Sequence, residues 1–399
     1  MYKLYCRSFQ QVMKATAFFL PWREPQLLEG ENSLEGLPML IKREGIGTVL
    51  IVTDKGIVAT GLMEDFLDGL RNEGIRFAMY DKTVPNPTID NIEEALQLYK
   101  ASHCQGLVAF GGGSPIDCAK GVGARLARPN RTIPQMKGIL KVIKKMPPLF
   151  AVPTTAGTGS EATLACVVSN SGTHEKFALM DTALIPHFAV LDPLLTVKLP
   201  KHITSTTGMD ALTHAVEAYI GNSNTNQTRQ WSIDAVKLIF ENLYEAYSIG
   251  ENIIARTNMQ KAAYLAGMAF TRAYVGNVHA IAHTLSGFYN VPHGLANAVI
   301  LPHVLDYYGE TVHEPLAELA EAAGVCASSD SNREKALKFI QAIKDLNEKM
   351  EIPVNVDCII DSDIPLMAER AVQEANPLYP VPKILLKEDM DKLIRTIGA

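Results

Sequence analysis

The first half of the chain alternates short apolar runs with segments of helical periodicity. The runs that are typical of strands cover residues 48–54, 77–80, 106–110 and 149–153. The helical patterns cover residues 60–73, 89–102 and a stretch that starts at Pro115. Strands that alternate with helices predict a parallel sheet covered by helices on both faces. Ligands of such sheets bind at the carboxyl ends of the strands.

After about Pro200 the strand signals nearly vanish, and long helical patterns take their place. These patterns cover residues 207–220, 228–248, 252–273, 278–287, 294–308, 314–323 and 332–350. A chain of 399 residues exceeds what one ordinary core serves, so two domains are expected. We predict an α/β domain with a parallel sheet over residues 1–200, including an N-terminal extension over residues 1–15. An all-α domain over residues 201–399 follows.

Composition places the chain among globular proteins, with 47% apolar residues, 20% charged residues and a net charge of −6. The basic residues are scattered, so nucleic acid is not an expected partner. No apolar run approaches the length that spans a bilayer, so we expect no membrane insertion. Six cysteines without a C-x-x-C pair predict free thiols in a reducing compartment, here the cytoplasm. They also argue against a thiolate zinc site.

The N-terminus carries a short amphipathic pattern. Its apolar positions on one helix face are Tyr2, Tyr5, Phe9, Val12 and Met13. The apolar stretch after them is short and lacks a cleavage pattern, so a signal peptide is not expected. We expect this helix to pack on its own protein or on a neighbouring subunit. A targeting or encapsulation helix is the alternative.

Two loops rich in glycine and hydroxyl side chains follow predicted strands. The first, residues 111–114, precedes a helix whose N-terminus suits a phosphate. The second, residues 153–161, offers many hydroxyl and amide donors. Neither loop is a Gly-x-Gly-x-x-Gly fingerprint or a Walker loop. Two phosphate-type loops at one edge of a sheet nevertheless predict a dinucleotide.

Asp54 ends the first predicted strand, where an acidic side chain can hold ribose hydroxyls. A carboxylate at that position repels a 2′-phosphate, so it favours NAD over NADP. The alternative interpretation of Asp54 is a helix N-cap or a turn residue.

The second half carries carboxylate and imidazole groups at helical spacing. Asp210 and His214 are four residues apart and therefore share a helix face, as do His279 and His283. His293 lies in a Pro-His-Gly turn, where its imidazole can point at the same site. Such a group is typical of a site for a divalent first-row metal.

The candidates outnumber the ligands that one catalytic metal needs, and Glu217 lies one turn beyond His214. Four protein ligands around a tetrahedral metal leave no open position, so catalysis needs three ligands or a metal with five or six. Iron(II) accepts the higher numbers more readily than zinc, and the lack of a thiolate excludes a soft-ligand site. Spacing alone does not decide which of His279 and His283 binds the metal and which is left for proton transfer.

Six ordered segments of the chain resemble the iron-containing (group III) alcohol dehydrogenases. They are residues 52–55, 85–88, 111–117, 153–161, 208–217 and 279–303. The resemblance implies a dinucleotide-binding α/β domain and a helical metal-binding domain of the dehydroquinate synthase-like fold, with the active site in the cleft. It also implies a metal-dependent hydride transfer between NAD(H) and a short primary alcohol, diol or aldehyde.

The resemblance implies roles for individual residues. The metal ligands fall on Asp210, His214, His279 and His293. Iron(II) is the expected metal, with zinc or another divalent ion as the alternative. His283 matches a family histidine near the substrate and is therefore expected to relay protons, and Phe270 matches a position near the substrate pocket. The positions that match cofactor contacts are Asp54, Asn86, Gly112, Gly113, Ser114, Thr154, Thr155, Thr158, Thr163, Lys176 and Leu195.

The chain departs from the family pattern near both ends. About the first fifteen residues extend beyond the usual start, and residues 375–382 replace the more typical Asn-Pro-Arg segment. The substrate of a well-known member is therefore not transferred to this chain.

Several alternatives stay open. The same fold serves glycerol-dehydrogenase-like and other polyol dehydrogenases, and also dehydroquinate-synthase-like lyases. The lyase calls for a more basic site than residues 201–310 offer. A metallohydrolase without a nucleotide and a non-enzymatic, shell- or scaffold-associated protein are further alternatives. The favoured prediction is an NAD-dependent cytoplasmic enzyme that forms a homodimer or a higher homo-oligomer.

Overall fold

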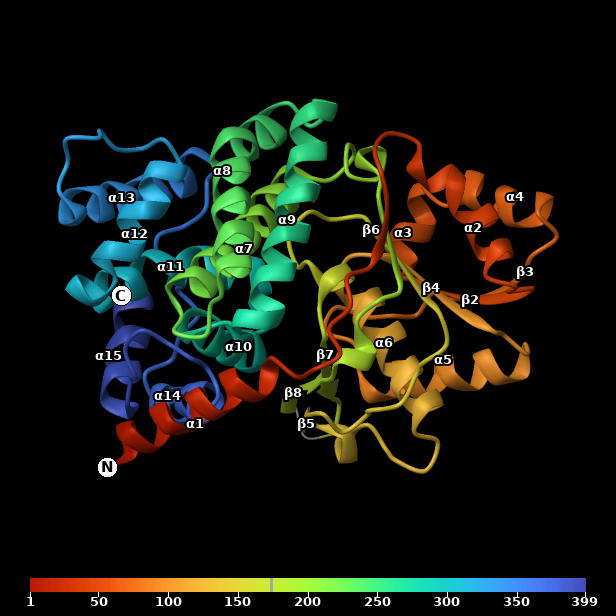
Figure 1. The fold of residues 1–399 in the computed structure, drawn as a ribbon, viewed down its shortest axis with the longest axis horizontal. Helices are drawn as coiled ribbons and strands as arrows, with labels where there is room; N and C mark the ends of the chain where they lie inside the picture. The colour runs from red at the N-terminus through yellow and green to blue at the C-terminus, as the bar shows by residue number, and fades with distance from the viewer. Residues whose placement is uncertain (173–174) are drawn as a thin grey trace. The chain divides into compact units, whose positions relative to one another are not determined.

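The computed structural model describes residues 1–172 and 175–399, and the chain divides into two compact units. One unit comprises residues 21–198, and the other comprises residues 1–20 together with 199–399 (Figure 1). The predicted α/β domain, residues 1–200, therefore loses its first twenty residues to the helical unit. The reason for this correction is a set of hydrogen bonds that the first helix makes with the C-terminal part of the chain.

The α/β unit is built on a six-stranded sheet with the order β1-β9-β6-β4-β2-β3, in which all neighbours are parallel. The strands are β1 (Gln26–Glu29), β2 (Thr48–Val52), β3 (Arg76–Tyr80), β4 (Gly106–Gly111), β6 (Leu149–Pro153) and β9 (Phe188–Leu191). The predicted parallel sheet is confirmed, and its four predicted strands correspond to β2, β3, β4 and β6. The strands β1 and β9 are not among the predicted ones.

Helices cover both faces of this sheet. They are α2 (Leu37–Arg43), α3 (Lys55–Thr60), α4 (Glu64–Asn72), α5 (Ile89–Ala101) and α6 (Gly113–Ala127). Side chains along β2 alternate between two cores, as the period of a strand requires. Leu50 and Val52 pack with α5 and α6, whereas Val49 and Ile51 pack with α2 and α4. The predicted helix over residues 60–73 corresponds to α4, and it begins later than predicted because Gly61, in the left-handed conformation, ends the preceding helix α3.

A second, smaller sheet was not predicted. Its order is β5-β8-β7, with β5 parallel and β7 antiparallel to β8. The strands are β5 (Gly138–Ile139), β7 (Ala165–Asn170) and β8 (Glu175–Met180). Because β7 follows the second glycine-containing loop, this sheet fixes where that loop ends.

The second unit is helical. Its helices are α1 (Tyr2–Ala17), α7 (Lys201–Ile220), α8 (Asn226–Ser248), α9 (Ile253–Ala273), α10 (Asn277–Tyr289), α11 (His293–Tyr308), α12 (His313–Ala322), α13 (Asn332–Lys349), α14 (Ile364–Ala375) and α15 (Lys387–Ile397). Local caps start several of them; Thr225 and Thr228, for example, cap α8 reciprocally. Helix α7 contacts α8, α9 and α11 and is buried along residues 208–220. Within residues 1–172 and 175–399, no helix is long and apolar enough to cross a membrane.

Helix α1 packs on its own protein, but not through the predicted apolar face. Tyr2, Tyr5 and Val12 are exposed, whereas Cys6 and Gln10 are buried. The contacts that hold α1 are hydrogen bonds from polar side chains to backbone carbonyls. The predicted helix is therefore confirmed, and within this chain it packs through the face of Cys6 and Gln10.

Candidate metal centre and cofactor loops

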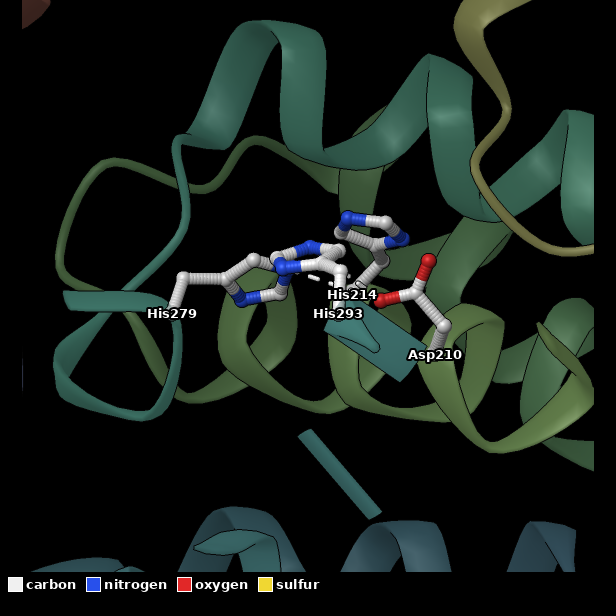
Figure 2. A group of neighbouring side chains, drawn as sticks. All are labelled: Asp210, His214, His279 and His293. Carbon is white, nitrogen blue, oxygen red and sulfur yellow. Dashed lines mark ion pairs between the residues drawn. The ribbon is translucent and has the colours of Figure 1, made fainter. Parts of the chain in front are cut away.

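Four predicted ligands come together in the helical unit. Asp210 and His214 of α7, His279 of α10 and His293 of α11 point into one space (Figure 2). One ligand atom from each residue lies within 4.8 Å of all the others. Two atoms that each lie about 2.0–2.2 Å from one metal are at most about 4.4 Å apart. The group therefore fits a single divalent metal after closing by a few tenths of an ångström.

The distances to the carboxylate show how compact the group is. Oδ1 of Asp210 lies 3.6 Å from Nε2 of His293 and 3.9 Å from Nε2 of His279. Three imidazoles and one carboxylate are donors that suit iron or zinc and do not suit a soft, thiolate-seeking metal. The donor chemistry thus fits the predicted metal as well as the spacing does.

Phe270 of α9 lies directly against this group. Its ring stacks on the ring of His214, with centroids 4.1 Å apart and planes 14° apart. The ring of His214 also stacks on that of His279, with centroids 4.5 Å apart. The structure therefore places the apolar ring of Phe270 against one face of the four-residue group.

The structure shows a contact of Glu217 that the sequence did not predict, a hydrogen bond with His279. Its carboxylate is buried and accepts hydrogen bonds from Nδ1 of His279 (2.6 Å), the Gly276 N–H (2.8 Å) and the Val278 N–H (2.7 Å). A carboxylate accepts only, so Nδ1 of His279 carries the proton and Nε2 is left as the ligand atom. Gly276 permits this approach, because a Cβ there would lie 2.6 Å from the Glu217 carboxylate. Glu217 thus orients His279, one of the four predicted ligands, and does not belong to the group itself.

Asn297 was missed by the sequence reasoning. It lies on α11, one turn beyond His293, and is fully buried. Its Nδ2 lies 2.6 Å from Oδ1 of Asp210, and 3.2 Å from Nε2 of both His279 and His293. The hydrogen bond to Asp210 orients the only carboxylate of the ligand group. The four-residue spacing from His293 was the available signal.

His283 lies beside the ligand group without joining it. Its ring stacks on that of His293, with centroids 5.1 Å apart. Its Nδ1 lies 2.5 Å from Oε1 of Glu374, on α14. Of the two histidines that spacing could not separate, the structure groups His279 with the ligands and pairs His283 with a carboxylate outside them.

The two glycine-containing loops meet at the carboxyl ends of β4 and β6. The structure brings together the predicted residues Gly112, Gly113, Ser114, Thr154, Thr155 and Thr158. The Thr154 N–H donates to the carbonyl of Gly111 over 3.0 Å. A Cβ on Gly113 would lie 2.9 Å from Thr158, so only glycine allows the loops this close. No side chain caps α6, which leaves its first N–H groups for an anion.

The other predicted cofactor residues have varied surroundings. Nζ of Lys176 donates to Oδ1 of Asn86 over 2.9 Å, which brings that pair together. Asp54 caps α3, since its Oδ1 accepts the Ile57 N–H over 3.0 Å. The cap uses one of the two carboxylate oxygens of Asp54. Leu195 is buried in the core that covers one face of the sheet.

Lys120 is a further residue that the sequence did not suggest. It lies two turns into α6, is fully buried, and its Nζ donates to Ser160, Thr163 and Ala165 at 2.8–3.1 Å. Asp117, which is half-buried, accepts a hydrogen bond from the Ser160 hydroxyl over 2.7 Å. Burial lowers the pKa of Lys120 and raises that of Asp117, and each charge offsets part of the other's shift. This pair ties the second loop, with Thr163, to helix α6.

Replacing Lys120 by Met should destabilise the α/β unit and weaken NADH binding. The substitution removes the buried ammonium that donates to oxygens of Ser160, Thr163 and Ala165, and each buried group that loses its partner costs about 1–3 kcal/mol. We expect the melting temperature to fall by about 2–4 °C for each kcal/mol lost. The matched control is Lys100→Met, at an exposed position of α5. A Lys120→Met protein that melts and binds NADH like the control would show that Lys120 does not hold the loop.

Known proteins resemble the chain over nearly its whole length. A model described as iron-containing alcohol dehydrogenase matches residues 25–193. A second, described as the C-terminal part of the Fe-containing alcohol dehydrogenase family, matches residues 204–398. Together the two models cover both units of the fold.

Individual relatives agree with the family models. A 1,3-propanediol dehydrogenase of Klebsiella pneumoniae is 41% identical over 87% of this chain and 90% of its own. An NAD-dependent methanol dehydrogenase of Bacillus methanolicus is 35% identical over 95% of this chain and 99% of its own. The crystal structure of a 1,3-propanediol oxidoreductase superposes with a TM-score of 0.91 at 37% identity, over 95% of this chain and 99% of that one. The chain therefore belongs to the iron-containing alcohol dehydrogenase family and is an oxidoreductase with that family's fold.

Proposed function

We propose that the protein transfers a hydride between NAD(H) and a short primary alcohol, a diol or the corresponding aldehyde, at a site that holds iron(II). The observation that carries the proposal is the ligand group of Asp210, His214, His279 and His293, which fits one divalent metal. Zinc is the alternative metal, because imidazole and carboxylate donors suit both ions. The names of the relatives, 1,3-propanediol dehydrogenase and NAD-dependent methanol dehydrogenase, support the substrate class and the cofactor.

When bound, the metal supplies Lewis-acid chemistry at the substrate oxygen, and NAD supplies the redox chemistry as the hydride acceptor or donor. The side chains of the site hold and orient these groups. Glu217 fixes the ring of His279, and Phe270 excludes water from one face of the ligand group. His283 relays the proton: its Nδ1 is bound to Glu374, so Nε2 is the atom that takes up or returns the alcohol proton.

The proposed cofactor site lies in the α/β unit. Gly112, Gly113 and Ser114 hold the pyrophosphate at the N-terminus of α6, where N–H groups and the helix dipole favour negative charge. The proposed hydroxyl contacts are Thr154, Thr155, Thr158 and Thr163. The remaining proposed contacts are Asn86, Lys176 and Leu195, with Asp54 at the adenosine ribose.

Asp54→Gly should shift cofactor preference toward NADP, because the carboxylate repels a 2′-phosphate. Relief of about 1.4 kcal/mol of repulsion already changes the ratio of kcat/KM for the two cofactors tenfold. Loss of the cap to glycine costs only a few tenths of a kcal/mol, roughly, so stability should hardly change. Asp54→Asn is the matched variant, since it keeps a capping oxygen and removes the charge. An unchanged kcat/KM ratio in both variants would show that Asp54 does not select the cofactor.

The proposed reaction is tested with a panel of alcohols and aldehydes, NAD(H) and protein loaded anaerobically with iron(II). We expect turnover of short primary alcohols, diols and their aldehydes, and loss of that turnover when the metal is removed. Turnover of polyols such as glycerol alone would favour the polyol dehydrogenase alternative. NADH binding without redox turnover of any alcohol would contradict the proposal and favour a lyase.

We further propose that the protein works in the cytoplasm as a homo-oligomer. All six cysteines are free thiols, and four of them are buried. An oxidising compartment favours disulfides in secreted proteins, so free thiols fit a reducing one. Light scattering of the purified protein tests the oligomer: we expect a mass of at least two chains, and the mass of one chain would refute it.

A further inference from the structure

We propose that α1 positions His283 through Tyr379 and Glu374. The inference rests on the proposed function, in which His283 relays the proton. It gives a shared role to the two segments where the chain departs from its family pattern, the first residues and residues 375–382. Figure 1 shows α1, in red, next to the C-terminal helices α14 and α15, in blue, between which the second segment lies.

The last link of this connection is a carboxylate that accepts two hydrogen bonds on one oxygen. Oε1 of Glu374 accepts from Nδ1 of His283 (2.5 Å) and from the Tyr379 hydroxyl (2.9 Å). Burial raises the pKa of Tyr379 well above its usual value, so its hydroxyl stays a donor. Because a carboxylate only accepts, Nδ1 of His283 carries the hydrogen and Nε2 is left for the substrate proton. The Tyr379 hydroxyl therefore helps to fix both the ring and its tautomer.

The middle link is Gln10 of α1, whose side chain is almost completely buried. Its Nε2 donates to the carbonyl of Tyr379 over 2.7 Å and to that of Pro377 over 3.2 Å. Residues 376–382 form no helix or strand, so their carbonyls have no regular backbone ladder. The Gln10 amide thus adds to the backbone hydrogen bonds of Tyr379, which join its N–H to Ala375 and its carbonyl to Val381. It bonds carbonyls on both sides of Leu378 and so helps to hold the backbone that carries the Tyr379 side chain.

Arg7 strengthens the same contact. Its guanidinium donates to the carbonyls of Val381 (2.6 Å) and Pro382 (2.7 Å), and to Oε1 of Gln10 (2.9 Å). A planar guanidinium with several donors is well suited to two adjacent carbonyls. Lys14 reaches the same segment indirectly. Its Nζ donates to the carbonyl of Asn222, and the side chain of Asn222 donates to the carbonyl of Val381. Polar side chains of α1 therefore hydrogen-bond the backbone along residues 377–382, the segment that carries Tyr379.

Glu374→Ala should lower kcat by about 10- to 100-fold, the usual loss when a carboxylate that orients a functional histidine is removed. Metal content and the KM for NAD should stay as in the wild type. Glu374→Gln keeps an acceptor for Nδ1 of His283, so its kcat should lie between those of the wild type and the alanine variant. A purely structural role predicts that kcat follows the melting temperature; equal kcat in all three proteins would overturn the inference.

Gln10→Ala tests the link to α1, with Gln11→Ala, its exposed neighbour on the same helix, as the matched control. We expect kcat to fall several-fold for Gln10→Ala and to stay unchanged for Gln11→Ala. If Gln10 acts through Glu374, Gln10→Ala should have no further effect on kcat in a Glu374→Ala background. Effects that multiply in the double variant would show that α1 does not act on His283 through Glu374.

The tautomer of His283 gives a readout that does not depend on turnover. In zinc-loaded protein labelled with 15N-histidine, the His283 signals, assigned with His283→Gln, should show a hydrogen on Nδ1. Glu374→Ala should shift the signals toward the Nε2-protonated form, and Gln10→Ala should shift them part of the way. If the protein oxidises no alcohol, the proposed function fails. The tautomer of His283 in the variants still shows whether α1 and Glu374 position this ring. Spectra that are identical in all variants would overturn the inference.

Discussion

His279→Ala should lose the metal and at least about 10³-fold in kcat/KM for alcohol oxidation. A bound metal supplies several kcal/mol of charge stabilisation, and each 1.36 kcal/mol changes the rate about tenfold. The imidazole of His279 is buried, and its Nδ1 is held by Glu217, so its loss removes a fixed donor from the group. The measurement is metal content by mass spectrometry alongside steady-state kinetics.

His283→Ala is the matched comparison, because both histidines lie on α10 one turn apart. This variant should keep its metal and lose about 10²-fold in kcat, the lower end for general acid–base catalysis. The distinction rests on geometry, since His279 lies within the ligand group and His283 pairs with Glu374. A His283→Ala protein that lacks metal, or a His279→Ala protein that keeps it, would reverse the assignment.

Glu217→Ala should destabilise the helical unit and weaken metal binding together. The substitution leaves the His279 Nδ1–H and the backbone N–H groups of Gly276 and Val278 without their acceptor in a buried place. Each lost partner of a buried group costs about 1–3 kcal/mol. Removing a carboxylate behind a ligating histidine also lowers metal affinity by about 10- to 100-fold.

The control for Glu217→Ala is Glu241→Ala, at an exposed position of α8. Glu217→Gln keeps an acceptor of nearly the same shape. Its melting temperature and metal affinity should lie between those of Glu217→Ala and Glu241→Ala. Thermal unfolding of the metal-free proteins separates the effect on the fold from the effect on the metal. Glu217→Ala protein that melts like the control and binds metal with wild-type affinity would remove Glu217 from the site.

Local pattern predicted the elements whose burial is uniform or strictly periodic. The strands β2, β4 and β6 are buried along their whole length, and their continuous apolar runs gave the parallel sheet. The strands β1 and β9 have four residues each, too few for a periodic signal. The strand β7 is half-buried and pairs antiparallel, against the pattern of its neighbours. Its partner and place in the fold depend on tertiary contacts.

Local spacing likewise predicted some of the site residues but not their separate roles. Spacing of four residues indicated Asp210 with His214 and also His279 with His283, because helix geometry puts each pair on one face. The same spacing could not tell a ligand from its neighbour, since the difference lies in distant partners. Glu217 is 62 residues from His279, and Glu374 is 91 residues from His283. Such contacts arise only when the helices pack.

Asp54 shows another limit of local pattern. The sequence offered a ribose contact and a helix cap as alternatives, and the structure confirms the cap. A cap uses one oxygen of a carboxylate, so the two interpretations do not exclude each other. Only the response of cofactor preference to Asp54→Asn separates them.

The proposed hydride transfer requires a single metal held by the four-residue group. The direct test is a titration of iron(II), under anaerobic conditions, into metal-free protein with NAD and a short primary alcohol present. NADH formation should rise linearly and stop rising at one metal per chain, and His279→Ala protein should show no such rise. NADH formation at full rate without metal, or an equal response of His279→Ala protein to iron, would contradict the requirement for this metal.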